Sequence, residues 1–188
     1  MKKTIRVLTV LIVILLALGA CAVPNGHLII YPSTPPPAEF VASVDASIIK
    51  VTPAPYPMSF VMSQEADDLV DAVNESFFPR LAFRRLEKAV KEGRSGFDNP
   101  AVYSTMAMYY EDAGDIDKAI EYYTLSLQLY DDDALMHLFR GNLYYQQGEF
   151  DLARKDLYKS LSLEMPDLTP FESYRNQMYQ LLWEMENH

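Results

Sequence analysis

Apolar residues recur at helical spacing near the C-terminus, with polar residues between them. The stripe consists of Phe171, Tyr174, Met178, Leu181, Leu182 and Met185. This spacing predicts an amphipathic helix over residues 170–187 that packs its apolar side onto the preceding chain. Upstream, Asn99-Pro100 is typical of a helix N-terminus, and Gly114 and Gly148 stand where left-handed caps would end a helix. The pattern therefore predicts an all-α body.

The same region contains an internal repeat. Seven residues return after a constant interval of 34 positions: Tyr110, Gly114, Asp117, Ala119, Ser126, Leu127 and Leu129 recur as Tyr144, Gly148, Asp151, Ala153, Ser160, Leu161 and Leu163. A fixed period of this length is typical of a helical array in which each unit packs on its neighbours.

These residues resemble the tetratricopeptide repeat. The first clear repeat carries the family's pattern as Tyr103, Met106, Ala107, Tyr110, Gly114, Ala119 and Tyr123, and the second as His137, Arg140, Gly141, Tyr144, Gly148, Ala153 and Leu157. The small residues would let two paired helices approach closely. His137 and Arg140 depart from the apolar residues of the family, so we expect the first helix of the second repeat to pack less tightly.

The resemblance implies a short solenoid of helical hairpins over residues 63–188, with seven helices. A degenerate repeat is expected at 63–98, where Leu69, Val73, Ala82, Leu86 and Ala89 match the spacing of the clearer units. Repeats at 100–133 and 134–167 follow. Residues 168–188 would form a capping helix that covers the open apolar end of the stack.

The N-terminus has the layout of a secretory signal. A cationic start is followed by an apolar run from Val7 to Leu18 and then by small residues. The segment Leu18-Gly19-Ala20-Cys21 resembles the lipobox of bacterial lipoproteins, which implies a signal peptide at residues 1–20 and a lipidated Cys21. Two or more acyl chains such as palmitate would anchor the chain stably to a membrane.

Two other interpretations of the leader stay open. An ordinary signal peptidase could cleave it, or Val7 to Val23 could remain as a single spanning helix, since about 17 residues is the lower limit for one. All three interpretations place the body outside the cytoplasm. We therefore expect a bacterial cell-envelope protein on the extracytoplasmic side of a membrane. In a diderm host, Ala22 after the cysteine would favour the outer membrane by the same resemblance.

Residues 21–62 form a proline-rich linker after this anchor. Eight of the twelve prolines lie here, and they disfavour any long helix or central strand. A β-prone or amphipathic stretch from Phe40 to Val51 interrupts the linker. It would either contact the solenoid or pair with a partner, and the first alternative is favoured.

Charge and composition restrict the function further. The formal charge is −10, which makes nucleic acid a poor partner. The single cysteine excludes an internal disulfide, and the three histidines have no metal-ligand spacing. Neither a nucleophile elbow nor a phosphate-binding glycine loop is present, and Asp131-Asp132-Asp133 fits helix capping better than Ca²⁺ binding. We predict a non-enzymatic protein without cofactor, metal or small-molecule substrate.

By resemblance, a protein partner would bind the concave face lined by the first helix of each repeat. The candidate residues are Thr105, Met108, Glu111, Asp112, Leu138, Phe139, Asn142, Tyr145 and Gln146, with Ala101, Ser104 and Leu135 beside them. The leading hypothesis is an adaptor that binds a protein segment in this groove. The alternatives are a pilot lipoprotein that carries a client through its linker or last helix, and peptide or ligand capture for uptake.

Overall fold

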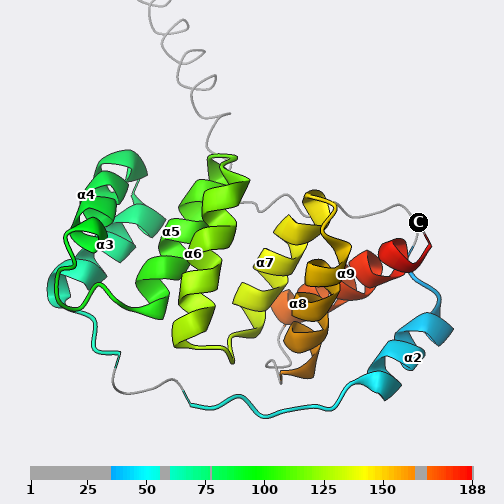
Figure 1. Cartoon of the computed structure of the whole chain (residues 1–188). Coiled ribbons are helices and arrows are strands. Elements are labelled where there is room, and N and C mark those ends of the chain that lie inside the picture. The colour runs from blue at the N-terminus through cyan, green and yellow to red at the C-terminus, as the bar shows by residue number, and fades with distance from the viewer. Residues whose placement is uncertain (1–34, 56–59, 77, 164–168, 188) are drawn as a thin grey trace, which may run out of the picture. The chain divides into compact units, whose positions relative to one another are not determined.

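The structure is a computed structural model that describes residues 35–55, 60–76, 78–163 and 169–187. The described part is built of helices, without a strand longer than a single bridge residue, so the predicted all-α class is confirmed (Figure 1). The helices are α2 (Ala38–Ser47), α3 (Gln64–Glu75), α4 (Pro79–Lys91), α5 (Pro100–Asp112), α6 (Ile116–Leu129), α7 (Ala134–Gln146), α8 (Phe150–Ser162) and α9 (Thr169–Glu186).

Six of these helices form three antiparallel hairpins. The pairs α3/α4, α5/α6 and α7/α8 each pack together, and α5 and α7 each pack against the hairpin before them (Figure 1). Within 63–188 the described helices number seven, as the resemblance implied. The arrangement is a helical solenoid in which each hairpin buries its apolar surface against its neighbours.

Local signals determine where the helices begin and end. The Asn99 side chain accepts a hydrogen bond from the Ala101 amide, and Pro100 occupies the first turn of α5. Gly114 and Gly148 have φ angles of 76° and 78°, so both adopt the left-handed conformation that ends a helix. These are the roles that the sequence predicted.

Small residues bring the helices of a hairpin together. Ala107, Ala119 and Ala153 are fully buried. A Cβ atom at Gly141 would lie 3.2 Å from Cβ of Asp156 and 3.3 Å from the Leu157 side chain. The α7/α8 contact is therefore close enough that a Cβ at this position would require Asp156 or Leu157 to shift by a few tenths of an ångström.

The degenerate first hairpin is joined to the second by aromatic contacts. Phe83 of α4 stacks on Tyr109 of α5, with ring centroids 3.6 Å apart and an interplanar angle of 10°. Leu86 and Ala89 are fully buried beside Phe83. The hairpin thus continues the solenoid at its N-terminal end.

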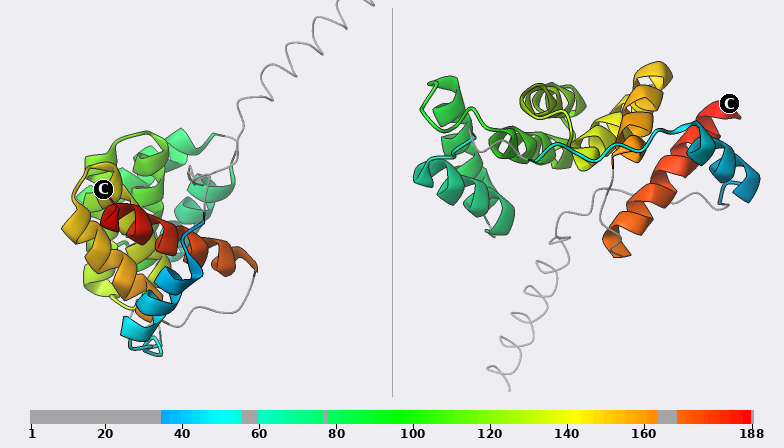
Figure 2. Two further views of the ribbon diagram at one scale, coloured as in Figure 1. Left: turned by 90° about the vertical axis from the view of Figure 1, so that its right-hand side faces the viewer. Right: turned by 90° about the horizontal axis from the view of Figure 1, so that it is seen from below.

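The part of the predicted linker that the structure describes contacts the body. Phe40 and Val44 of α2 are buried, and the Phe40 ring meets Trp183 of α9 edge to face at a centroid distance of 5.0 Å. Both views of Figure 2 place α2 beside α9. The stretch from Phe40 to Val51 is helical over most of its length, and it packs on the solenoid as the favoured alternative predicted.

Extended residues after α2 also contact the body. The Val51 amide donates to the Ser162 carbonyl at 2.7 Å, and the Lys50 ammonium donates to the Leu161 carbonyl at 2.8 Å. The Ala54 amide donates to Asp132 in the loop before α7. Residues 35–55 are therefore not a free spacer. Proline prevents a long helix here, but it does not prevent short elements from packing.

Candidate protein-interaction surface

The predicted binding residues lie on α5 and α7, but three of them are inside the core. Thr105, Leu138 and Phe139 are 2%, 1% and 8% exposed. The Phe139 ring lies 6.1 Å from Tyr123 of α6 and 6.0 Å from Tyr174 of α9. Because all three side chains are buried, the expectation that they line an open groove is corrected for this structure.

Tyr145 forms a hydrogen bond with the last helix, α9. Its hydroxyl donates to the Glu184 carboxylate of α9 at 2.7 Å. Partial burial and this carboxylate raise the pKa of Tyr145 to about 12. The buried side chains of α9 include Met178, Leu182 and Met185, which belong to the predicted apolar stripe. The capping helix therefore covers part of the predicted groove on α7.

Glu111 has an internal partner as well. Its carboxylate accepts a hydrogen bond of 2.6 Å from the hydroxyl of Tyr123 on α6. Burial, together with Glu111, raises the pKa of Tyr123 well above its ordinary value. Glu111 therefore fixes the α5/α6 hairpin, while the neighbouring Asp112 is exposed.

The rest of the predicted surface remains accessible. Asp112 and Gln146 are exposed, and Met108 and Asn142 are half-buried. Ala101, Ser104 and Leu135 are half-buried too. The accessible side chains are small, apolar or amide-bearing with one carboxylate, which suits contact with a polypeptide segment better than with a charged ligand.

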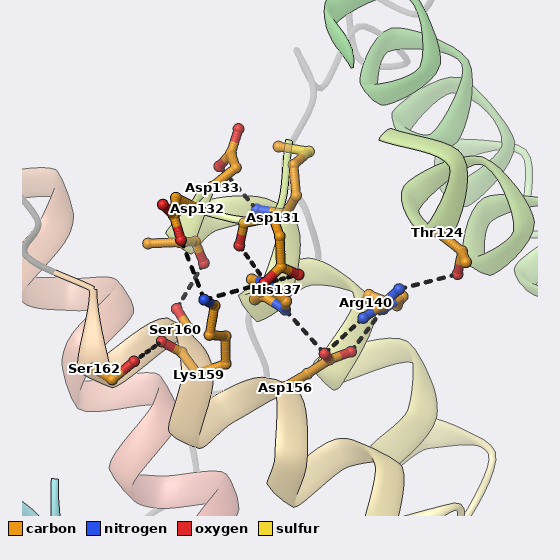
Figure 3. Close-up of polar contacts among 12 residues, drawn as sticks. Thr124, Asp131, Asp132, Asp133, His137, Arg140, Asp156, Lys159, Ser160 and Ser162 are labelled. Atoms are coloured by element: carbon orange, nitrogen blue, oxygen red, sulfur yellow. Dashed lines mark hydrogen bonds and ion pairs between the residues drawn. The ribbon is translucent and has the colours of Figure 1, made fainter. Parts of the chain in front are cut away.

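A buried charged network fixes α7 beneath this surface. Figure 3 shows Asp156 of α8 between His137 and Arg140 of α7. Asp156 and His137 are only 2% and 3% exposed. Arg140 donates to both carboxylate oxygens, with Nε at 2.7 Å and Nη2 at 2.8 Å, and to the Thr124 hydroxyl of α6 at 3.1 Å.

The network continues to the loop before α7. His137 Nδ1 lies 2.9 Å from Asp156, and Nε2 lies 2.9 Å from the carbonyl oxygen of Asp131. Burial raises the pKa of Asp156, but hydrogen bonds from Arg140 and His137 outweigh it and leave this pKa below its usual value. The expectation that His137 and Arg140 loosen α7 is therefore wrong, because both are tied to a partner carboxylate.

Sequence reasoning missed Asp156 as that partner, although the repeat contained a signal. The three network positions correspond, 34 residues earlier, to Tyr103, Met106 and Tyr122. In that repeat the Tyr103 and Tyr122 rings lie 6.3 Å apart. One repeat thus fills this location with uncharged side chains and the next with an ionic set, and all three positions change together.

The three aspartates of the loop before α7, Asp131, Asp132 and Asp133, have partners within the chain. Asp133 accepts hydrogen bonds from the amides of Leu135 and Met136, so it caps α7 as predicted. Asp131 and Asp132 both contact the Lys159 ammonium, at 3.1 and 3.2 Å. Across the described ranges no group of His, Cys, Asp and Glu could hold a metal ion, and nothing there points to catalysis.

Cys21 and the leader lie outside the described residues. In the portion that is described, no helix is both long and apolar enough to cross a membrane.

Comparison with known families agrees with the repeat geometry. Residues 100–133 and 134–164 each match the tetratricopeptide repeat family, and the two matches coincide with the α5/α6 and α7/α8 hairpins. No curated protein matches the chain. Repeats of this family generally mediate binding to protein partners. The all-helical solenoid and the two consecutive matches together support a tetratricopeptide repeat protein.

Proposed function

We propose that the protein is a non-enzymatic adaptor, tethered by a lipidated Cys21 to the extracytoplasmic face of a bacterial membrane, that binds a segment of another protein along α5 and α7. The observation that carries this proposal is the surface around Met108, Asn142 and Gln146. It lies on two helices whose buried faces belong to one continuous core. Among the described residues, none of these three side chains has a hydrogen bond to α9 like that of Tyr145.

Rigid support is what such a surface needs. The positions beneath it are fixed by the Arg140–Asp156 ion pair and by the Tyr123–Glu111 hydrogen bond. Because these groups are already ordered, a partner segment would not have to organise α5 or α7 when it binds. The expected partner is an extended or helical polypeptide that makes apolar and amide contacts.

The proposed lipid anchor is inferred from the sequence of the leader alone. The apolar run, the Leu-Gly-Ala-Cys segment and the single cysteine favour lipidation over an ordinary cleavage site. A lipidated Cys21 would be followed by proline-rich chain before α2. The body would then act at the membrane surface, on the outer membrane if the host is diderm.

The pilot alternative places the binding determinant on the linker or on the last helix. In this structure α2 and α9 are engaged with each other, because Phe40 packs on Trp183 and the Tyr179 hydroxyl donates to Asp45. A client that bound either helix through these side chains would have to displace the other. This intramolecular contact favours binding along α5 and α7.

Crosslinked co-purification from native membranes tests the proposal. The first variant combines Asn142→Ala with Gln146→Ala, which removes two amides from the proposed surface while leaving Tyr145 on Glu184. The matched control is Gln128→Ala, which removes an exposed amide from α6. We expect a protein that is recovered with wild type and with the control but not with the double variant.

A second variant, Cys21→Ser, tests the tether separately. Lipidation predicts that wild type carries an acyl label and that Cys21→Ser does not. Recovery of the same proteins with wild type and with the Asn142→Ala, Gln146→Ala double variant would contradict binding along α5 and α7. Wild type that stays in the membrane without an acyl label would instead favour an uncleaved spanning helix.

A further inference from the structure

The first hairpin leaves open the face on which another hairpin would stack. In α7, Phe139 contacts Tyr123 of the preceding hairpin, and Leu143, one turn later on the same side of the helix, is fully buried. The corresponding residues of α3, counted back by one period of 34 and one of 37, are Asp68 and Ala72. Asp68 is exposed and Ala72 is half-buried, because no helix of the described chain covers this face of α3.

A cleft of about 490 Å³ lies at this open face, between α3 and α4. Its lining includes Leu69 and Ala72 of α3, Leu81 of α4 and Phe78, which immediately precedes α4. Phe78 and Leu81 are 86% and 68% exposed, which is unusual for side chains of this size that lie next to each other. The cleft therefore offers an apolar centre that lacks a covering element in the described structure.

Charges of opposite sign lie on the two sides of this centre. The α3 side is acidic and the α4 side is basic. The exposed acidic residues of α3 are Glu65, Asp67, Asp68, Asp71 and Glu75, and the exposed basic residues of α4 are Arg80, Arg84, Arg85, Lys88 and Lys91. Glu65 and Lys91 are engaged by Arg94 and Glu87 within the chain. Among the described residues, Arg80, Arg84 and Arg85 have no ion-pair partner. The two helices thus form an apolar strip with an acidic and a basic border.

Such a surface is complementary to itself under two-fold rotation. Consider a two-fold axis that passes through the apolar centre, in the plane of the interface and parallel to the two helices. It places α3 of each copy on α4 of the other, so the same contact occurs twice in one interface. Asp68 of each copy would then face Arg85 of the other, while Phe78 and Leu81 would meet their own counterparts near the axis. We propose that the open face of the α3/α4 hairpin is a self-association surface whose occupant is a second copy of this chain.

The net charge restricts the strength of the association. The chain carries −10 overall, so two copies repel each other at long range. Local complementarity and apolar burial have to exceed that repulsion. The resulting dimer forms and dissociates with concentration and is not an obligate one.

Charge reversal in trans tests the proposal with the full chain. Asp68→Lys places like charges opposite Arg85 twice, and Arg85→Glu places like charges opposite Asp68 twice. A mixture of the two variants restores both opposite-charge pairs in the heterodimer. Each variant alone should dimerise about tenfold or more weakly than wild type, and the equimolar mixture should recover to within about threefold of it.

Sedimentation equilibrium over a concentration series measures these constants, and apolar variants complete the design. Leu81→Asp should abolish the dimer. The control is Leu152→Asp, which changes the corresponding position in α8, where the leucine is 43% exposed, and should leave the dimer intact. Circular dichroism on each variant checks that the fold is retained.

Three results would overturn the inference. The inference is contradicted if wild type stays monomeric at every concentration. It is also contradicted if wild type dimerises and Leu81→Asp does not weaken that dimer. A mixture of the two charge variants that associates no better than either one alone would also contradict the two-fold pairing of α3 with α4.

Discussion

Arg140 and Asp156 form a two-point ion pair inside the second repeat, with Nε 2.7 Å from Oδ2 and Nη2 2.8 Å from Oδ1. The Asp156 side chain is 4% exposed and the Arg140 side chain is 15% exposed. A parallel two-bond geometry of this kind is the strongest arrangement available to these two groups. The pair connects α7, which bears half of the proposed binding surface, to α8.

Removal of the carboxylate should be costly. Asp156→Ala leaves Arg140 and His137 without their shared acceptor in the core, and breaking a buried pair in this way costs about 3–5 kcal/mol of unfolding free energy. Urea denaturation followed by circular dichroism measures the loss. Asp151→Ala, at an exposed position of the same helix, is the control and should stay within about 0.5 kcal/mol of wild type. If Asp156→Ala lowered the unfolding free energy no more than the control does, the ion pair would not be needed for stability.

Replacing the whole network should be tolerated. The triple variant His137→Tyr, Arg140→Met and Asp156→Tyr installs the residues that the first repeat has at these positions. Because well-packed neutral residues often equal or exceed a buried ion pair, its unfolding free energy should lie within about 1 kcal/mol of wild type or above it. If the triple variant were as unstable as Asp156→Ala, the two repeats would not have interchangeable cores.

Wild type and the triple variant should also differ in how their stability depends on pH. The folded-state pKa of Asp156 lies below the ordinary pKa of an aspartate, so ionised Asp156 stabilises the fold at every pH above that ordinary pKa. The contribution is lost as the pH falls through the folded-state pKa. As the pH falls below about 4, near the ordinary pKa of an aspartate, wild type should therefore lose stability more steeply than the triple variant. Other carboxylates are common to both proteins, so equal slopes would contradict the role of Asp156.

Gly141 should not accept a larger side chain. Its missing Cβ would lie 3.2 Å from Asp156 and 3.3 Å from Leu157, so Gly141→Leu would force α7 and α8 apart at a cost of about 1–3 kcal/mol. Gln146→Leu, on the exposed side of the same helix, is the control. Urea denaturation distinguishes the two, and equal stability of both variants would show that the helices have room at this contact.

The contact between α2 and α9 has a spectroscopic reporter. Trp183 is the only tryptophan, and Phe40 packs against its ring. Phe40→Ala should expose the indole, shift its emission to longer wavelength and increase amide exchange in residues 38–47. Glu39→Ala, on the exposed side of α2, should leave the emission unchanged. Identical spectra for Phe40→Ala and wild type would mean that α2 does not rest on α9 in solution.

The solenoid could be predicted because its determinants are local and repeated. Gly114 and Gly148 end helices through their own backbone conformation, and Asn99 caps α5 through an amide two residues away. Small residues at Ala119 and Ala153 recur at the period of the array. Each of these signals can be recognised without knowledge of distant contacts.

The burial of part of the predicted groove could not be predicted in the same way. Tyr145 is occupied by Glu184, a residue 39 positions later on a helix whose docking angle no local pattern determines. The family pattern places Phe139 on the concave face, yet contact with Tyr174 buries it. Asp156 was detectable only by comparing both repeats at three positions at once. The docking of α2 depends on tertiary contact with Trp183, which composition does not encode.

The most direct test of the adaptor proposal is site-specific photocrosslinking in native membranes. A photoreactive residue at position 142 would lie on the proposed surface, and one at position 128 would lie on the exposed side of α6. We predict a discrete crosslinked protein from position 142 that is missing from position 128. Equal crosslinking from both positions, or none from 142 with a clear product from 128, would contradict binding along α5 and α7.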